Sequence, residues 1–341
     1  MKNITIKTIS ENTQVSLTTV SRVMNGVAEK YRISAKTAER VLKEAEKLGY
    51  IPNQSAINLR LKKSFSIGLI VPSLANPFFS TVVSIVNKTL HEKGYSLLVA
   101  DSNENEQTEI DAVKHLVSRN IEGIIIIPSG RKTDHINQLI KRNLPVVFVD
   151  RYFKELPVSY VSTDHFDGAF KMVEYLISRG HKHIACIQGG RHVMSNQERV
   201  NGYKAAISKN GFGYEYVGGN SFTMEDGYLE TKLLLQQREK PTAIFALSDT
   251  ILLGVLKALK EDGYQVPDDI SVASFDNSIY LDYLACPVTS ISQPISEISQ
   301  IAIRLLLDKV DYQGKDGSLS DKQEILISPS IIHRKSVKDI L

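Results

Sequence analysis

The sequence VSLTTVSRVMNG, residues 15–26, has the pattern of a short amphipathic helix with its own start signal. The hydroxyl of Ser16 can accept from the free N–H groups of a first helical turn, and Val15 and Val20 are spaced to form a hydrophobic staple across that start. The helix has two faces, which are Val20, Val23 and Met24 on one side and Leu17, Thr18, Ser21 and Arg22 on the other. We expect the first face to pack and the second to be presented to solvent.

Two further helices are predicted on either side of this one. Thr5 is placed to cap a helix with Ile6 and Ile9 on its apolar side, and Ser34 to cap a third helix that ends at Gly49. A helix, a tight turn and a second helix with exposed Thr and Arg is the helix-turn-helix arrangement, in which the second helix enters the major groove of DNA. The pattern alone also suits a helical cap without DNA contacts.

Charge distinguishes this N-terminal part from the rest of the 341-residue chain. Residues 1–63 contain twelve Lys and Arg against five Glu, a net charge of +7, whereas the remaining residues carry −4 of the total of +3. A basic head on a mildly acidic body is typical of a nucleic-acid-binding module attached to a larger domain of another purpose.

From residue 65 onward, apolar strands alternate with amphipathic helices. Runs of Ile and Val with helices between them indicate parallel sheets covered on both faces. Two series of strands are predicted, at 66–71, 95–100, 123–127 and 146–149, and at 183–187, 242–246 and 270–275. Two doubly wound halves in one chain imply a cleft between them.

The motifs VSxxTVSRVxNG and LGYxPN of the head resemble those of the lactose-repressor (LacI/GalR) family of bacterial transcription regulators. The resemblance continues along the whole chain through NPFF, EGIIIIP, RGHKHIA and FDNS. Two features depart from the family pattern. Thr8, Ile9 and Ser10 replace the usual Asp-Val-Ala, and the loop at residues 27–33 is longer than is typical by about three residues.

The resemblance implies an all-α helix-turn-helix head with a hinge helix and an α/β body with the type I periplasmic-binding-protein fold. Residues 1–63 would be the DNA-binding domain and hinge, and residues 64–341 the effector-binding and dimerisation domain. The body would consist of two subdomains with parallel doubly wound sheets. The first would comprise residues 64–161 and 291–322, and the second residues 162–290 and 323–341.

The resemblance also implies which head residues contact DNA. Leu17, Thr18 and Arg22 would reach base edges, and Leu59 of the hinge would wedge between base pairs in the minor groove. The residues expected to contact phosphates are Thr5, Ser16, Thr19, Asn25 and Asn53. A Leu in such a linker would otherwise be read as packing against the core.

Ligands of open parallel sheets bind beyond the carboxyl ends of the strands. Carboxylates, amides and an aromatic wall follow those ends here and suit a sugar, whose hydroxyls take charge-assisted hydrogen bonds and whose ring face stacks. The candidates are Asn76, Phe79, Asp101, Asp150, Ser248 and Asp276, to which the resemblance adds Arg199 and Phe222. Each Asp could instead cap the helix that follows it.

No enzyme motif, cofactor-binding motif or metal-ligand cluster is found in the sequence. Cys186 and Cys286 are far apart, the N-terminus lacks a secretory signal, and no apolar run approaches the roughly 20 residues of a membrane span, so a cytoplasmic protein is expected. We interpret the chain as a homodimeric repressor of carbohydrate genes that binds a pseudo-palindromic operator and is controlled by a sugar-like effector. The alternatives are a purine-responsive or phosphocarrier-protein-responsive regulator of the same family, or a solute receptor or sugar-acting enzyme sharing the body fold.

Overall fold

The computed structural model describes residues 4–50, 63–312 and 321–341. The chain forms two compact units, Met1–Ser64 and Phe65–Leu341, which we call the head and the body. The expected hinge helix, with Asn53 and Leu59, lies outside the described residues.

The head contains the three predicted helices and one short 3₁₀ turn. These are α1 (Ile6–Thr13), α2 (Leu17–Met24), η1 (Glu29–Tyr31) and α3 (Ala35–Lys47). The predicted caps are confirmed, since Thr5, Ser16 and Ser34 accept from the backbone N–H groups three residues ahead at 3.4, 3.1 and 3.2 Å. The helices enclose a small core formed by Ile9, Val15, Val20, Val23, Val41 and Ala45. The polar face of α2 is thereby turned outward.

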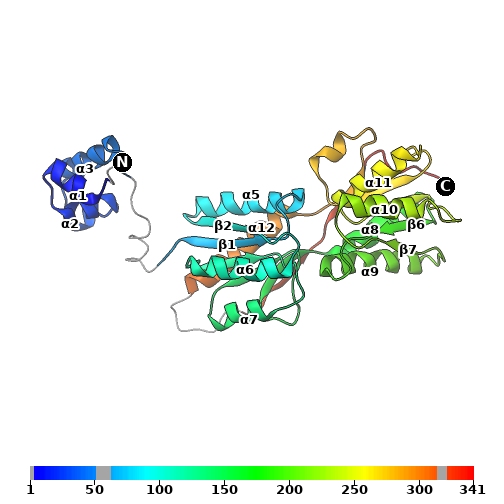
Figure 1. Ribbon diagram of the computed structural model, residues 1–341, viewed down its shortest axis with the longest axis horizontal. Coiled ribbons are helices and arrows are strands. Elements are labelled where there is room, and N and C mark those ends of the chain that lie inside the picture. Colours follow the sequence, from blue (N-terminus) through cyan, green and yellow to red (C-terminus); the bar gives the residue numbers. More distant parts are fainter. Residues whose placement is uncertain (1–3, 51–62, 313–320) are drawn as a thin grey trace. The chain divides into compact units, whose positions relative to one another are not determined.

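The first half of the body is a six-stranded sheet with strand order β11-β5-β4-β3-β1-β2, parallel in every pairing. Its strands are β1 (Ser66–Val71), β2 (Ser96–Asp101), β3 (Gly123–Ile126), β4 (Val146–Val149), β5 (Ser159–Thr163) and β11 (Glu324–Ile327). The helices are α5 (Pro77–Glu92), α6 (Glu106–Ser118), α7 (Asp134–Lys141) and α12 (Ile295–Tyr312). Helices α5 and α12 pack on one face and α6 and α7 on the other, as Figure 1 shows.

The second half is built in the same way, with strand order β12-β10-β9-β8-β6-β7. Its strands are β6 (Ile184–Ile187), β7 (Tyr216–Gly218), β8 (Ala243–Ala246), β9 (Ser271–Phe275), β10 (Thr289–Ser292) and the antiparallel β12 (Ser330–Ile332). The helices are α8 (His165–Ser178), α9 (Met194–Lys209), α10 (Met224–Leu234), α11 (Asp249–Glu261) and the 3₁₀ helix η2 (Ile279–Asp282). Helices α8 and α9 contribute to one apolar core and α11 with the end of α10 to the other. The expected fold class is confirmed.

The chain passes between the two halves three times. It leaves the first sheet after β5, returns after β10 through α12, and leaves again between β11 and β12. The third crossing lies later in the chain than expected. Residues 323–341 were expected in the second half, but β11 pairs with β5 of the first half, from Glu324↔Tyr160 through Ile327↔Thr163. β11, which ends at residue 327, therefore belongs to the first half. The local sequence pattern did not indicate this, because an edge strand pairs with a segment that is distant in the sequence.

Candidate functional site

The outward face of α2 carries the predicted base-reading residues. Leu17 is 51% exposed, Thr18 is exposed and Arg22 is half-buried, while Val20 and Val23 on the opposite face are buried. An open groove of about 740 Å³ runs beside this face and is lined by Ile6, Leu17, Thr18, Ser21, Arg22, Val27, Lys30 and Tyr31. A basic and hydroxyl-bearing helix face beside such a groove can meet base edges.

The predicted phosphate-contacting residues lie at helix ends. Thr5 and Ser16 are the N-caps of α1 and α2, Thr19 is hydrogen-bonded to Ser16 at 2.9 Å between hydroxyls, and the amide of Asn25 donates to the carbonyl of Ser21. Because each hydroxyl has a second lone pair and a donor, capping leaves it able to bind a phosphate as well. Helix N-termini also favour an anion.

In the body, Arg199 lies on α9 and is almost fully buried at the boundary of the two halves. One terminal nitrogen donates to the carbonyl of Leu247 at 2.6 Å and lies 3.9 Å from the carboxylate of Asp276. The guanidinium carbon stands 3.8 Å from the centroid of the Phe275 ring. Burial lowers the pKa of Arg199, and the carboxylates of Asp276 and Asp150 oppose that shift. The arrangement holds a planar cation in one orientation.

Asp276 follows β9 directly and has a positive φ of 71°, a conformation that turns the chain sharply at the strand end. Its carboxylate accepts a hydrogen bond from the amide of Gln293. Burial raises the pKa of Asp276 to about 7, Arg199 lowers it, and the nearby carboxylate of Asp249 raises it. Asp276 is therefore an acceptor whose proton is easily gained or lost near neutral pH.

Asp150 repeats this geometry at the end of β4, with φ of 62°. Its carboxylate lies 3.1 Å from Nε2 of His165. Since Nε of Arg199 donates to Nδ1 of His165 at 3.3 Å, the neutral ring carries its proton on Nε2, toward Asp150. Burial opposes ionisation of Asp150, but His165 together with Arg199 and Arg151 holds its pKa below the usual value. A chain of buried polar groups thus runs from Asp150 to Asp276.

The two predicted aromatic residues both lie near Arg151. Its guanidinium carbon is 5.4 Å from the centroid of the Phe79 ring and 5.7 Å from that of Phe222. Arg151 itself is held by Glu104 in a bidentate pair at 2.7 and 2.8 Å. The Phe222 ring stands against Gly189, where an added Cβ would lie 2.3 Å from the ring, so only glycine leaves room for it.

Three predicted effector residues are engaged in local structure. Asp101 is exposed and accepts from the backbone of Leu74 and Asn103, and Ser248 is the N-cap of α11. Asn76 caps α5 and also reaches Thr250 of the second half, with 3.5 Å between the side-chain atoms. Within the described ranges, no hydrogen bond or ion pair joins Asp101 to Arg199 or Asp276, whereas Asn76 faces the boundary of the two halves.

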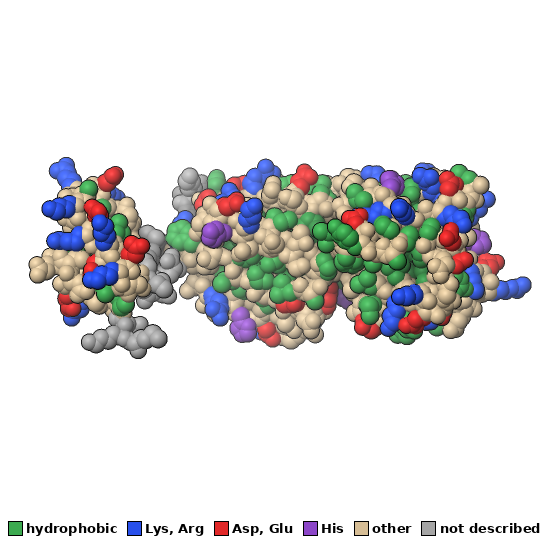
Figure 2. All heavy atoms as spheres, turned by 90° about the horizontal axis from the view of Figure 1, so that it is seen from above, with side chains coloured by type: hydrophobic (Ala, Val, Ile, Leu, Met, Phe, Trp, Pro, Cys, Tyr) green, Lys and Arg blue, Asp and Glu red, His purple; other side chains and the backbone are tan. Residues whose placement is uncertain are grey.

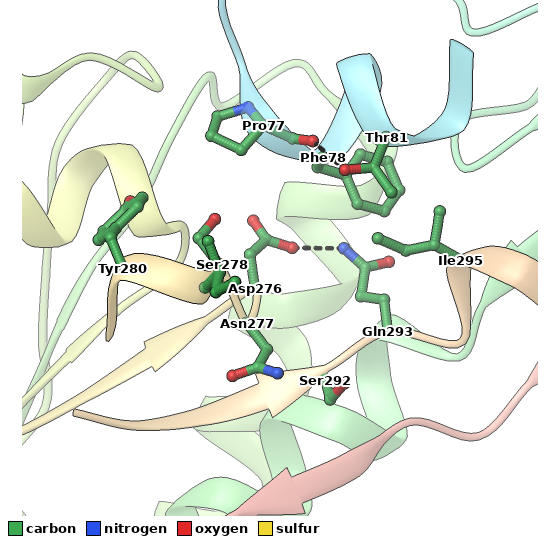
Figure 3. A pocket seen from close by; sticks show the side chains of 11 residues that line it. Pro77, Phe78, Thr81, Asp276, Asn277, Ser278, Tyr280, Ser292, Gln293 and Ile295 are labelled. Atoms are coloured by element: carbon green, nitrogen blue, oxygen red, sulfur yellow. Dashed lines mark hydrogen bonds between the residues drawn. The ribbon is translucent and has the colours of Figure 1, made fainter. Parts of the chain in front are cut away.

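Two cavities open between the halves of the body. The first, of about 400 Å³, is lined by Pro77, Phe78, Thr81, Asp276, Asn277, Ser278, Ile279, Tyr280, Ser292, Gln293 and Ile295. Figure 3 shows Pro77, Phe78 and Thr81 of α5 on one side of it and Asp276, joined to Gln293, on the other. The second, of about 370 Å³, is bordered by residues 128–131, 151–155, 192–194, 197 and 198. Arg199 is almost fully buried and lines neither cavity; its hydrogen bonds and ion pair join it to His165, Leu247 and Asp276.

Sequence reasoning missed Arg151, His165 and Gln293, which link the predicted residues to one another. Arg151 and Gln293 do follow apolar strands as polar residues, which is the signal that could have found them. Among the described residues, no cluster of three His, Cys, Asp or Glu is arranged to hold a metal ion. Within the same ranges, no helix is long and apolar enough to cross a membrane.

The chain joins a three-helix head with an exposed face on α2 to an α/β body whose two halves meet at buried polar groups. This combination defines a DNA-binding regulator of the helix-turn-helix class. The profile of bacterial regulatory proteins of the lacI family matches residues 5–53. That of periplasmic binding proteins and the sugar binding domain of the LacI family matches residues 64–326. The chain belongs to the LacI family and is a DNA-binding transcription regulator.

Several relatives span nearly the whole chain. It is 32% identical over 326 residues to the transcriptional repressor CytR of Escherichia coli K12, covering 94% of this chain and 95% of that protein. It is 30% identical over 320 residues to catabolite control protein A of Priestia megaterium, covering 93% and 96%. The crystal structure of the Lac repressor dimer bound to operator and the anti-inducer ONPF is similar with a TM-score of 0.86, at 27% identity, covering 99% of this chain and 100% of that one. These relatives favour a regulator over a solute receptor or an enzyme.

Proposed function

We propose that the protein is a homodimeric repressor that reads a pseudo-palindromic operator with α2 and responds to a sugar-like effector bound around Arg199 and Asp276. One observation carries the effector assignment: a fixed guanidinium and a carboxylate lie 3.9 Å apart at the boundary of the two halves. Such a pair can bind neighbouring hydroxyls of one sugar ring. The family profile over residues 64–326, which includes a sugar binding domain, supports this assignment.

A purine is the second candidate, and the pair of rings beside Arg151 favours it. Phe79 and Phe222 both lie near the same guanidinium, and a flat base can stack on such rings. We further propose that the protein acts in the cytoplasm, catalyses no reaction and needs no cofactor. The relatives named above, which are transcription regulators, support that view.

The test combines DNA selection with calorimetry on the full-length protein. Duplexes recovered from a random pool would define the operator, and a panel of sugars, sugar phosphates and purines would then be titrated with and without it. We expect one sugar or sugar derivative to bind and to change operator affinity. If only a purine bound, the carbohydrate assignment would be wrong while the regulator assignment stood.

Effector affinity is expected to depend on pH through Asp276. Burial raises its pKa to about 7, so below that pH the carboxyl must release a proton before it can accept from a hydroxyl. We expect affinity to fall about tenfold per pH unit below 7 and to level off above it. Burial lowers the pKa of His165 and thus favours its neutral form.

Calorimetry between pH 5.5 and 8.5 checks this expectation, with Asp276→Asn as the variant that cannot titrate and should bind weakly at every pH. The raised pKa of Asp276 has the opposite effect on stability. The contribution of Asp276 to the free energy of unfolding is fully present below pH 3.8 and is lost as the pH rises through about 7. A pH-independent affinity in the unmodified protein would contradict the role of Asp276.

The dimer is proposed from apolar side chains left on the surface of the body. The edge strand β2 exposes 39% of Val99, and Ile279 and Tyr283 are 78% and 82% exposed. Figure 2 shows hydrophobic side chains gathered over part of the visible face of the body. Exposed apolar residues of this size favour association, and a two-fold operator matches a two-fold dimer.

Sedimentation at micromolar concentration is expected to give twice the chain mass of 38.0 kDa. Replacing Ile279 and Tyr283 together by Asp should shift the protein toward the monomer, because charges would be buried without partners. Phe166→Asp, at an apolar residue of α8 that is 39% exposed, serves as the control and should leave the dimer intact. A stable tetramer, or an unmodified protein that sediments as a monomer, would overturn the assignment.

A further inference from the structure

The longer loop of the head forms a defined turn beside α2. Tyr31, Arg32 and Ile33 donate from their backbone N–H groups to carbonyls of Ala28 and Glu29 at 3.2, 2.9 and 3.0 Å. Arg32 adopts a left-handed conformation, with φ of 54°, which closes the turn. Ala28 and Ile33 at its two ends pack against the head core. The backbone that carries Tyr31 is therefore anchored to the same core as α2.

The ring of Tyr31 lies against the guanidinium of Arg22, with 3.8 Å between the guanidinium carbon and the ring centroid. This distance is that of a stacked cation–π contact. Tyr31 is 45% exposed and Arg22 is half-buried, so the pair lies at the surface of the head, along the groove beside α2. Apart from this stack, the side chain of Arg22 makes no hydrogen bond or ion pair among the described residues.

We propose that Tyr31 is a positioning residue for DNA reading, which holds the guanidinium of Arg22 in the orientation that binds a base edge. The inference rests on the proposed function of the head. A ring on one face of the guanidinium leaves its in-plane N–H groups free, and these donors form the bidentate contact with O6 and N7 of guanine. Stacking also restricts the rotamers of Arg22 before DNA binds, so less side-chain entropy is lost on binding.

Tyr31 therefore acts on specificity, whereas Lys30 beside it acts on affinity. Lys30 is exposed on the same turn and lines the same groove, where an ammonium group can bind a phosphate without reading sequence. The two neighbours provide a matched comparison, because loss of either removes one exposed side chain from one turn.

The experiment measures discrimination between the selected operator and duplexes with one altered base pair, using the full-length protein. The base pair read by Arg22 is the one at which Arg22→Ala loses its preference. We expect Tyr31→Ala to lower discrimination at that pair by roughly fivefold and to leave the other positions unchanged. Tyr31→Phe keeps the ring and should retain the preference. Lys30→Ala should weaken binding to all duplexes equally and reduce the salt dependence.

A double variant tests whether Tyr31 acts through Arg22. In the Arg22→Ala background, Tyr31→Ala should have no further effect on discrimination. Unchanged discrimination in Tyr31→Ala, or an equal loss at every position, would overturn the inference while the proposed function stood. If the unmodified protein selected no sequence from the pool, the proposed function and this inference would both fall. Circular dichroism verifies that the variants remain folded.

Discussion

Replacing Arg199 by alanine is expected to abolish the effector response while operator binding by the effector-free protein is retained. Arg199 donates to the carbonyl of Leu247, lies beside Asp276 and contacts the ring of His165, so its loss removes the guanidinium that joins these groups. Hydroxyls of a bound sugar would lose a charged donor, and buried acceptors would be left unpaired. We expect effector affinity to fall about 100-fold or more, which corresponds to about 2.7 kcal/mol.

Calorimetry and operator titrations with and without effector measure this result. Lys204→Ala is the matched control, because Lys204 lies on the same helix, is exposed and pairs with Glu215 at 2.8 Å. Removing one partner of a buried pair also lowers stability, so thermal unfolding must verify that the Arg199→Ala variant is folded at the assay temperature. Wild-type effector affinity in this variant would show that the assignment of the site is wrong.

Arg22→Ala should relax the discrimination of one base pair in each half of the operator. Arg22 is on the outward face of α2, and a bidentate contact with guanine contributes about 1–3 kcal/mol of discrimination, or roughly 5- to 150-fold. Binding to random DNA should change much less, because that binding depends mainly on phosphate contacts elsewhere in the head.

Competition titrations with the operator and with random duplexes distinguish these effects. Lys7→Ala on α1 is the comparison, since Lys7 is exposed and paired only weakly, at 3.9 Å, with Glu11. Lys7→Ala should weaken binding to all duplexes alike and flatten the salt slope, because a phosphate contact carries no sequence information. Equal losses on operator and random DNA for Arg22→Ala would contradict a base-reading role.

The helices of the head could be predicted because their signals are local. Ser16 and Ser34 cap through atoms three residues away, and the core face of α2 repeats every third or fourth residue. Seven strands of the body, β1 to β4, β6, β8 and β9, were recognised for the same reason, whereas β5, β7, β10, β11 and β12 were not predicted. The third crossing could not be located, because β11 depends on pairing with β5 more than 150 residues earlier, and its exposed alternation resembles a surface segment.

The candidate sites were predicted only in part. Asp150 and Asp276 could be found at strand ends, where ligands of parallel sheets bind. Their linkage through His165 and Arg199 could not, because those residues come from different helices whose packing depends on the whole fold. The contact between the ring of Tyr31 and Arg22 could not be predicted either, because the length of a loop does not indicate where its side chains lie.

The three crossings restrict how the halves of the body can move. The segments lie close together, since the N–H of Asp164 donates to the carbonyl of Ile327 at 2.9 Å and Thr163 donates to the side chain of Gln293 at 2.6 Å. Three adjacent covalent links resist sliding and separation of the halves, and we expect them to act as the hinge of any rotation between the halves. Gln293 lies in one of these links, between β10 and α12, and also donates to the carboxylate of Asp276. An effector that binds Asp276 therefore acts at the pivot, where a small displacement is amplified with distance from the axis.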